Sequence, residues 1–264
     1  MRRILMCPPT YFGIEYEINP WMSRGRRVDR AKAEKQWRDL HDLLCGRLGL
    51  SISLLRPRKG LPDLVFTANA GLVHGDAFIP SNFRHLERRG EEPVFRQWFE
   101  KEGYRIRPLP ANLFFEGEGD VLRLDSRLFA GYRFRSDIRS HEWISKELGM
   151  PVLSLELVDD RFYHLDTCFC PLAGDAAVYY PPAFDSYARR VIDEGIPRKV
   201  LPPPEDALRF ACNAVVAGRK AVLPAGCETM RKLLEGLGYE VWETELSEFI
   251  KAGGAAKCLV LFLD

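Results

Sequence analysis

The sequence lacks the features that mark several broad classes of protein. Its formal net charge is +1, from 38 lysines and arginines against 37 aspartates and glutamates, and no segment is basic enough to bind a nucleic acid. No apolar run approaches the roughly 20 residues of a membrane-spanning helix, so we expect no membrane partner. Residues 1–9 are too short for a signal peptide and indicate a first strand. The seven cysteines include no CxxC pair, which fits reduced thiols in a cytoplasmic protein.

The chain does contain a five-fold internal repeat. A polar residue stands before an apolar hairpin pattern five times, at intervals of 45 to 51 residues, and such a period is typical of radial or solenoidal repeats. The hairpin patterns cover 70–80, 121–134, 167–181, 214–224 and 259–263, and the polar residues before them are Asn69, Asp120, Asp166, Asn213 and Cys258. If each repeat is one blade of a ring, these five side chains share one pocket near the axis.

Helical patterns complete the repeat. Apolar residues at helical spacing predict helices over 28–48, 92–100, 137–148, 184–193 and 228–237. Short extended runs follow the last three, at 151–157, 199–201 and 239–244. Five units of strand, strand, helix, strand predict one α/β ring domain over residues 1–264, with strands inside and helices outside. The first strand would pair with the last and close the ring.

Two polar segments lie outside this repeat. Residues 8–27 carry several aromatic side chains, and residues 83–90 carry arginines and a histidine. Loops often carry function. The first segment could close over the pocket as a lid or pack across the ring as an arm, and both readings stay open.

Cys258 is the candidate nucleophile. It follows the small residues 253–256, which would let a substrate approach the thiol. The neighbouring Lys257 would favour the thiolate, which is the reactive form. A single buried cysteine is more often a small hydrophobic residue, and the glycine pair before it favours a functional role.

Two further motifs could supply proton transfer and charge. His164 and Asp166 alternate at the start of a strand pattern, which would place both on one face, and a histidine beside a carboxylate can carry protons. Residues 115–120 hold three acids, and the phenylalanines before them indicate that Glu116 points inward. A buried acid needs a cationic partner, so a cationic ligand fits. No paired histidines at i,i+4 frame a metal site, and neither metal nor cofactor is expected.

In combination these motifs resemble a known family. The pattern Glu116-Gly-Glu-Gly-Asp120, His164-x-Asp166 and Gly-Gly-x-x-x-Cys258 is similar to the guanidine-modifying superfamily of pentein fold, which includes arginine deiminase, dimethylarginine dimethylaminohydrolase and the amidinotransferases. Residues 16–22 and 61–69 resemble its arginine dihydrolase branch, known as the N-terminal module of certain cyanobacterial arginine-catabolic enzymes.

The resemblance implies a five-bladed α/β propeller that hydrolyses the guanidinium group of arginine. Cys258 would attack the guanidinium carbon, and His164 would protonate the leaving ammonia and then activate water. Glu116 and Asp166 would hold the guanidinium nitrogens. Arg84 and Arg135 would grip the α-carboxylate, with Arg133 as a rival to Arg135. The resemblance places the further substrate-binding residues at Asn19, Asp63, Asn69 and Asp120.

Asn69 separates the alternatives. Deiminases and dimethylarginine hydrolases usually carry a carboxylate there, which only accepts hydrogen bonds, whereas an amide can also donate one to a ureido oxygen. Asn69 therefore favours an arginine dihydrolase, which keeps citrulline for a second attack and yields ornithine, carbon dioxide and ammonia. The alternatives are a dimethylarginine dimethylaminohydrolase or an arginine deiminase that releases citrulline, and a non-catalytic binding module. A small-molecule partner is expected, and a homo-oligomer is compatible with the sequence.

Overall fold

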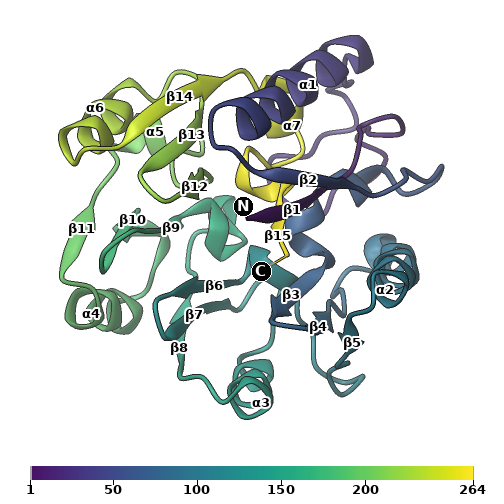
Figure 1. Ribbon diagram of the computed structural model, residues 1–264, viewed down its shortest axis with the longest axis horizontal. Helices are drawn as coiled ribbons and strands as arrows, with labels where there is room; N and C mark the ends of the chain where they lie inside the picture. Colours follow the sequence, from purple (N-terminus) through teal and green to yellow (C-terminus); the bar gives the residue numbers. More distant parts are fainter. Residues whose placement is uncertain (1, 264) are drawn as a thin grey trace.

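A ring of five three-stranded sheets forms the protein in a computed structural model that describes residues 2–263 (Figure 1). The sheets have the orders β15-β1-β2, β3-β4-β5, β6-β7-β8, β9-β10-β11 and β12-β13-β14. In each sheet the first two strands are antiparallel and the third is parallel to the second. The predicted five-bladed α/β propeller is therefore confirmed. The strands are β1 (Arg3–Met6), β2 (Ser51–Leu54), β3 (Gly71–His74), β4 (Ala77–Pro80), β5 (Arg105–Ile106), β6 (Val121–Leu124), β7 (Arg127–Tyr132), β8 (Val152–Glu156), β9 (Phe169–Leu172), β10 (Ala176–Tyr179), β11 (Arg198–Val200), β12 (Val215–Ala217), β13 (Lys220–Pro224), β14 (Glu240–Thr244) and β15 (Leu261–Phe262).

The two ends of the chain close the ring. β1 and β15 lie near its centre in Figure 1 and pair antiparallel, with Ile4 opposite Phe262 and Leu5 opposite Leu261. Ile4, Leu5 and Leu261 are fully buried. The predicted closure is confirmed, and it makes β1 the central strand of its sheet, between β15 and β2.

Five longer helices cover the outside of the ring (Figure 1). In the first, Asp29 caps the N-terminus by accepting from the backbone N–H of Lys32, and the apolar residues that predicted the helix face inward. No helix in residues 2–263 is long and apolar enough to cross a membrane. The helices are α1 (Arg30–Gly46), α2 (Glu92–Lys101), α3 (Ile138–Leu148), α4 (Ser186–Gly195) and α6 (Glu228–Gly236), with two short additions, α5 (Pro204–Ala207) and α7 (Ser247–Ile250).

The polar residues of the repeat tie neighbouring blades together around the axis. Each lies in or beside a tight turn just before the hairpin of its blade, and the first four are each hydrogen-bonded to the equivalent turn of the next blade. Residues about one repeat apart in the sequence are thus joined by hydrogen bonds between neighbouring blades. The bonds run from Asn69 Nδ2 to the Glu116 carbonyl at 3.3 Å, from the Leu165 N–H to Asp120 Oδ1 at 3.1 Å, from Asn213 Nδ2 to the Asp166 carbonyl at 3.0 Å, and from the Cys258 N–H to Asn213 Oδ1 at 3.1 Å.

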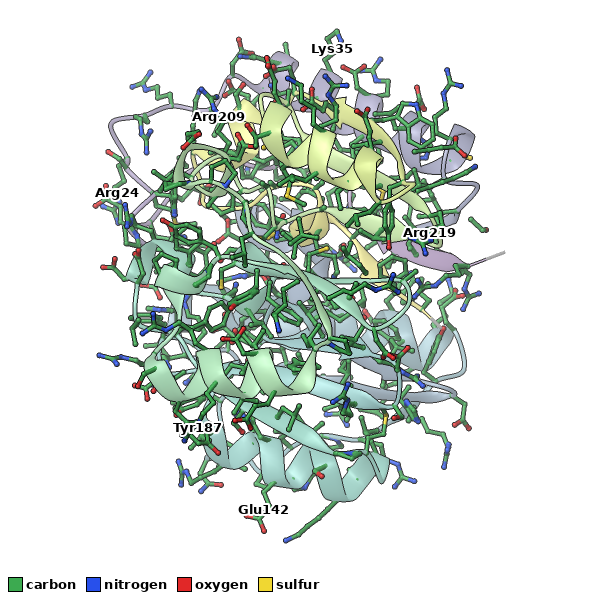
Figure 2. All side chains as sticks on the ribbon, turned by 90° about the vertical axis from the view of Figure 1, so that its left-hand side faces the viewer. Arg24, Lys35, Glu142, Tyr187, Arg209 and Arg219 are labelled. Carbon is green, nitrogen blue, oxygen red and sulfur yellow. The ribbon has the colours of Figure 1, made fainter. Side chains whose placement is uncertain are left out.

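The ring has two distinct faces. Seen from the side in Figure 2, Arg24 of residues 8–27 lies at one face and Arg219, in the turn between β12 and β13, lies at the other. A small cavity lies under residues 8–27, and a larger cavity includes Gly218 beside Arg219. The axial turns therefore separate two cavities on opposite sides of the molecule.

Candidate active site

The smaller cavity is covered by residues 8–27. Its volume is about 10 Å³, which is room for one water molecule. Three of its lining side chains come from that segment, so the segment packs over the cavity, which fits both the lid reading and the arm reading. The lining residues are Ile18, Asn19, Met22, Asp63, Phe66, Asn69, Arg88, Arg135, Tyr163, Ala252, Gly254 and Cys258.

Cys258 lies in a 3₁₀ turn, Lys257–Leu259, just before the short strand β15. Asn213 holds it twice, because its Nδ2 donates to Sγ at 3.1 Å and its Oδ1 accepts from the Cys258 N–H at 3.1 Å. Asp166 Oδ2 lies 3.3 Å from Sγ. Asn213 was not among the predicted catalytic or substrate-binding residues. The repeat pattern, which placed Asn213 near the axis together with Cys258, could have identified it.

The thiol of Cys258 is protonated in this closed state. Burial, and then the negative charge of Asp166, raise its pKa well above the ordinary value for cysteine. The expectation that Lys257 directly favours the thiolate is wrong, because the Lys257 ammonium donates to Glu118 Oε2 at 2.8 Å and to the Val260 carbonyl at 3.1 Å. A cationic ligand beside Sγ would lower the thiol pKa, since it favours the thiolate.

His164 is paired with Glu116 and not with Asp166. Both His164 and Asp166 were expected on one face of a strand, but residues 165–167 form a 3₁₀ turn that sends the two side chains to different partners. His164 Nε2 lies 2.7 Å from Glu116 Oε2, and Arg135 Nη1 donates to the same oxygen at 2.9 Å. Glu116 is fully buried, as predicted. Burial raises the pKa of Glu116, but Arg135 and His164 outweigh it and hold the pKa well below its usual range.

Arg88 is a site residue that the sequence did not identify. Its guanidinium donates to both oxygens of Glu91, at 2.8 and 2.7 Å, and to Asn69 Oδ1 at 2.7 Å. Asp63 lies beside it, with Oδ2 3.9 Å from Arg88 Nε and with Oδ1 lacking any hydrogen-bond partner among residues 2–263. Burial raises the pKa of Asp63. Residues 83–90 were noted for their arginines, but nothing in that run distinguishes Arg88, which a 3₁₀ turn, Leu86–Glu91, directs inward.

Four residues that were predicted to contact substrate lie outside the cavity lining: Arg84, Asp120, Asp166 and Glu116. Arg84 donates from Nε to the Arg135 carbonyl at 3.0 Å and lies over the ring of Phe114, whereas Arg88 lines the cavity. Asp120 accepts from Ser136 at 2.6 Å and from the Leu165 N–H, which makes it a link between blades. For all four residues a contact with substrate stays a prediction. The rival Arg133 pairs with Glu156 at 2.7 Å on the surface.

The lid segment is fastened beside the glycine pair. Asn19 Nδ2 donates to the Ala252 carbonyl at 3.1 Å, and a Cβ built on Gly253 would lie 3.0 Å from Asn19 Oδ1 and 2.9 Å from the Tyr163 hydroxyl. Gly253 has a φ of +83°, and a Cβ on Gly254 would lie 2.5 Å from the Phe66 ring. The small residues before Cys258 therefore let the lid and the Phe66 ring pack closely around the thiol.

Known proteins share this architecture. A comparison with protein-family models found no match. The bifunctional arginine dihydrolase/ornithine cyclodeaminase ArgZ of Synechocystis is 48% identical over 98% of this chain. The N(G),N(G)-dimethylarginine dimethylaminohydrolase of Mycobacterium tuberculosis is 42% identical over 98% of this chain and 85% of its own length. The crystal structure of the N-terminal domain of ArgZ, covalently bound to a reaction intermediate, is 47% identical and superposes with a TM-score of 0.96 over 100% of this chain and 98% of that domain.

The chain belongs to the guanidine-modifying, or pentein, superfamily. It spans 37% of the length of ArgZ.

In this pentein the five polar residues of the repeat do not all face one cavity. Only Asn69 and Cys258 line it, while Asp166 and Asn213 lie against the thiol and Asp120 lies in the ring of turns.

The pentein site combines a thiol, buried acids and buried arginines in one small volume. A thiol such as that of Cys258, with an acid in contact, can act as a nucleophile, and a histidine paired with a carboxylate, such as His164 with Glu116, can give or accept a proton. Asp63 Oδ1 offers an acceptor for a ligand N–H, and the guanidinium groups of Arg88 and Arg135 can bind a carboxylate. No group of three or more His, Cys, Asp or Glu side chains within residues 2–263 could hold a metal ion.

Proposed function

We propose that residues 1–264 form a single catalytic domain that hydrolyses arginine to ornithine, carbon dioxide and two ammonia molecules. The observation that carries this proposal is an amide, Asn69, in the lining of a cavity that also holds Cys258. The likeness to the N-terminal domain of ArgZ, a dihydrolase by name, supports it.

Free thiols at all seven cysteines support a cytoplasmic location. A homo-oligomer stays a prediction.

Arginine would bind after residues 8–27 move away from the cavity. Its guanidinium would lie between Cys258 and the acids Asp166 and Glu116, because a planar cation is favoured beside ionised carboxylates. The α-carboxylate would lie against Arg88 and Arg135. Return of the segment would then exclude water from the cation and fix its plane for attack.

The first hydrolysis would use Cys258 as a covalent catalyst. Asp166, which burial gives a pKa of about 7, would take the proton from Sγ as Sγ bonds to the guanidinium carbon. The bond from this carbon to a terminal nitrogen would break, and His164 would give that nitrogen the proton with which it leaves as ammonia. Water, activated by His164, would add to the carbon, the C–S bond would break, and citrulline would remain in the site.

The second hydrolysis would repeat these steps on the ureido group. Cys258 would attack the ureido carbon, the second terminal nitrogen would leave as ammonia, and water would release a carbamate that loses carbon dioxide to give ornithine. Asn69 Nδ2 would hold the ureido oxygen by donating a hydrogen bond, and Arg88 fixes that orientation because it donates to Asn69 Oδ1. The two hydrolyses consume two water molecules and release two ammonia molecules.

A dimethylarginine dimethylaminohydrolase is the second candidate. The observation in its favour is the Mycobacterium tuberculosis relative, because this chain covers 85% of that protein and only 37% of ArgZ. Such an enzyme would remove dimethylamine and stop at citrulline. It would need space at one terminal nitrogen of the bound guanidinium for two methyl groups.

The two candidates differ in substrate and product. We would give the protein arginine and asymmetric dimethylarginine in separate reactions and quantify ornithine, citrulline, ammonia and dimethylamine. The dihydrolase predicts ornithine from arginine and a much lower kcat/KM for dimethylarginine. Citrulline as the end product with fast release of dimethylamine would instead establish the second candidate. A protein that binds arginine without turnover would indicate a binding module.

A further inference from the structure

Glu91 is a buried acid that lies behind the candidate active site. It is fully buried, ends the 3₁₀ turn Leu86–Glu91, and does not line the smaller cavity. Its Oε1 accepts from Arg88 Nε at 2.8 Å, and its Oε2 accepts from Arg88 Nη2 at 2.7 Å. Two such parallel bonds are the bidentate geometry of an ionised carboxylate. Burial raises the pKa of Glu91, and the positive charge of Arg88 opposes this rise. The path from Glu91 to the cavity therefore runs through Arg88.

The guanidinium of Arg88 has almost no free donor. An arginine side chain has five N–H groups. Two of them go to Glu91, one goes from Nη2 to the Asp63 carbonyl at 3.3 Å, and one goes from Nη1 to Asn69 Oδ1 at 2.7 Å. Within residues 2–263 that leaves one N–H, on Nη1, for a ligand in the cavity. Three residues therefore fix the position of the guanidinium.

Arg88 in turn fixes the amide of Asn69. Asn69 Oδ1 accepts from Arg88, and Asn69 Nδ2 donates to the Glu116 carbonyl at 3.3 Å. Turning the amide over would set its NH₂ group against the guanidinium donors and its oxygen against a carbonyl, so both ends oppose the flip. One Nδ2 hydrogen goes to Glu116, and the other can point to a ligand oxygen. Asn69 therefore offers the cavity a hydrogen-bond donor and not an acceptor.

Asp63 is the second acid beside this guanidinium. Its Oδ2 lies 3.9 Å from Arg88 Nε, and its Oδ1 is buried without a hydrogen-bond partner in the described part of the chain. A buried arginine needs an anion. Without the charge of Glu91, Asp63 would be the remaining ion-pair partner among residues 2–263, and the guanidinium would turn toward it. That turn would take Nη1 away from Asn69 and cover the free oxygen of Asp63.

We propose that Glu91 is a positioning residue that sets the preference of this site for a ureido ligand, because it holds Arg88 on Asn69 and so directs the amide N–H to the ureido oxygen. The inference rests on the proposed function, in which citrulline stays bound for a second hydrolysis. A guanidinium has only N–H groups where a ureido group has an oxygen, so a donor at Asn69 favours the ureido group. Glu91 acts on this choice without touching the ligand.

Binding measurements test this role without turnover. We would use Cys258→Ser, which lacks the nucleophile, and measure the affinities of citrulline and arginine by calorimetry, with and without Glu91→Gln. The ratio of the two affinities is the readout, because both ligands carry the same α-carboxylate and any loss of carboxylate binding at Arg88 cancels. Loss of the hydrogen bond to the ureido oxygen should lower the preference for citrulline about tenfold. With Asn69→Ala also present, Glu91→Gln should leave the ratio unchanged.

Two further variants control for effects on folding. Asp206→Asn removes another buried acid, which accepts from the Met230 N–H at 2.7 Å and lines neither cavity, so it should leave the ratio unchanged. Arg88→Met combined with Glu91→Met replaces the ion pair by apolar side chains, a kind of change that often preserves stability. This double variant should lower the ratio as Glu91→Gln does, and it takes the place of Glu91→Gln if that variant fails to fold.

Two results would overturn the proposal. An unchanged ratio in Glu91→Gln would make the acid merely structural, and a fall of the same size in the presence of Asn69→Ala would show that Glu91 acts by a route other than the amide. A Cys258→Ser protein that binds neither ligand would contradict the proposed function itself, on which the inference rests. Formation of ornithine by the wild type is measured separately, so the two failures are distinguishable.

Discussion

The Sγ of Cys258 lies 3.3 Å from Oδ2 of Asp166. Burial and the charge of Asp166 raise the pKa of this thiol. Burial also raises the pKa of Asp166 itself, to about 7. Because both groups are buried, the thiol holds on to its proton in the empty site, and the acid ionises only as the pH rises through about 7. A guanidinium cation is the kind of ligand that changes this balance, since its charge favours the ionised form of each group.

Replacing the nucleophile should abolish turnover without unfolding the protein. Cys258→Ser keeps a small side chain that can still bond with Asn213, but its hydroxyl is a far weaker nucleophile. We expect kcat to fall by several orders of magnitude, with a melting temperature close to that of the wild type. Activity above a few per cent of the wild type would exclude the covalent mechanism.

Neutralising Asp166 should stabilise the protein while it removes activity. Burial raises its pKa from 3.8 to about 7, so the folded state prefers the protonated acid. Between these pH values the unfolded chain ionises and the folded protein does not, and the wild type loses stability as pH rises. The melting temperature of Asp166→Asn relative to the wild type should therefore increase from pH 4 to pH 7 and level off above. A constant difference across that range would show that Asp166 has an ordinary pKa.

Glu116→Gln should be costly for both folding and catalysis. The substitution removes the charge shared by Arg135 and His164 and leaves a buried guanidinium without its ion-pair partner. Breaking a buried pair in this way costs about 3–5 kcal/mol of stability. We also expect a loss of about 10²–10⁴-fold in kcat, typical of general acid/base catalysis. Chemical denaturation and steady-state rates measure the two effects, and an unchanged unfolding midpoint would contradict the ion pair.

The arginines of the cavity should make the α-carboxylate important. Agmatine, which lacks that group, would leave Arg88 and Arg135 without an anion, so its kcat/KM should be far below that of arginine. Arg88→Ala should cause a similar loss for arginine itself. Arg84→Ala is the matched control, because Arg84 is outside the cavity lining and should matter much less. Equal kcat/KM values for agmatine and arginine would assign these arginines another role.

The repeat made the ring and its axis predictable, whereas the direction of individual side chains was not. A period that places Asn69, Asp120, Asp166, Asn213 and Cys258 at equivalent points is a property of the whole chain, and hydrophobic spacing located the five long helices. β2 and β5 escaped prediction, since one is a half-polar strand of four residues and the other has only two residues.

The errors in the site share one cause. All involve tight turns of three to six residues, in which neighbouring side chains point in different directions and no sequence period applies. Such turns send Lys257 away from Cys258, separate His164 from Asp166, and bring Arg88 inward. These directions depend on partners far along the chain, including Glu118 for Lys257 and Glu116 for His164.

Asn69→Asp should change the products more than the rate of the first step. A carboxylate would pair with Arg88 but would repel the ureido oxygen of citrulline, which the amide is proposed to hold. The loss of one hydrogen bond and the added repulsion are worth roughly 1–3 kcal/mol, or about tenfold or more in the partition between release and second attack. Citrulline should accumulate with this variant, and an unchanged citrulline-to-ornithine ratio would rule out this role for Asn69.

The most direct measurement is the fate of the guanidinium carbon in the wild-type protein. Arginine labelled at that carbon would be followed in a closed vessel, with citrulline, ornithine and carbon dioxide quantified over the first turnovers and at completion. The two-step hydrolysis predicts that the label leaves as carbon dioxide in step with ornithine, at two ammonia molecules per arginine and with little free citrulline at any time. Label that stays in citrulline, with one ammonia molecule per arginine, would contradict it.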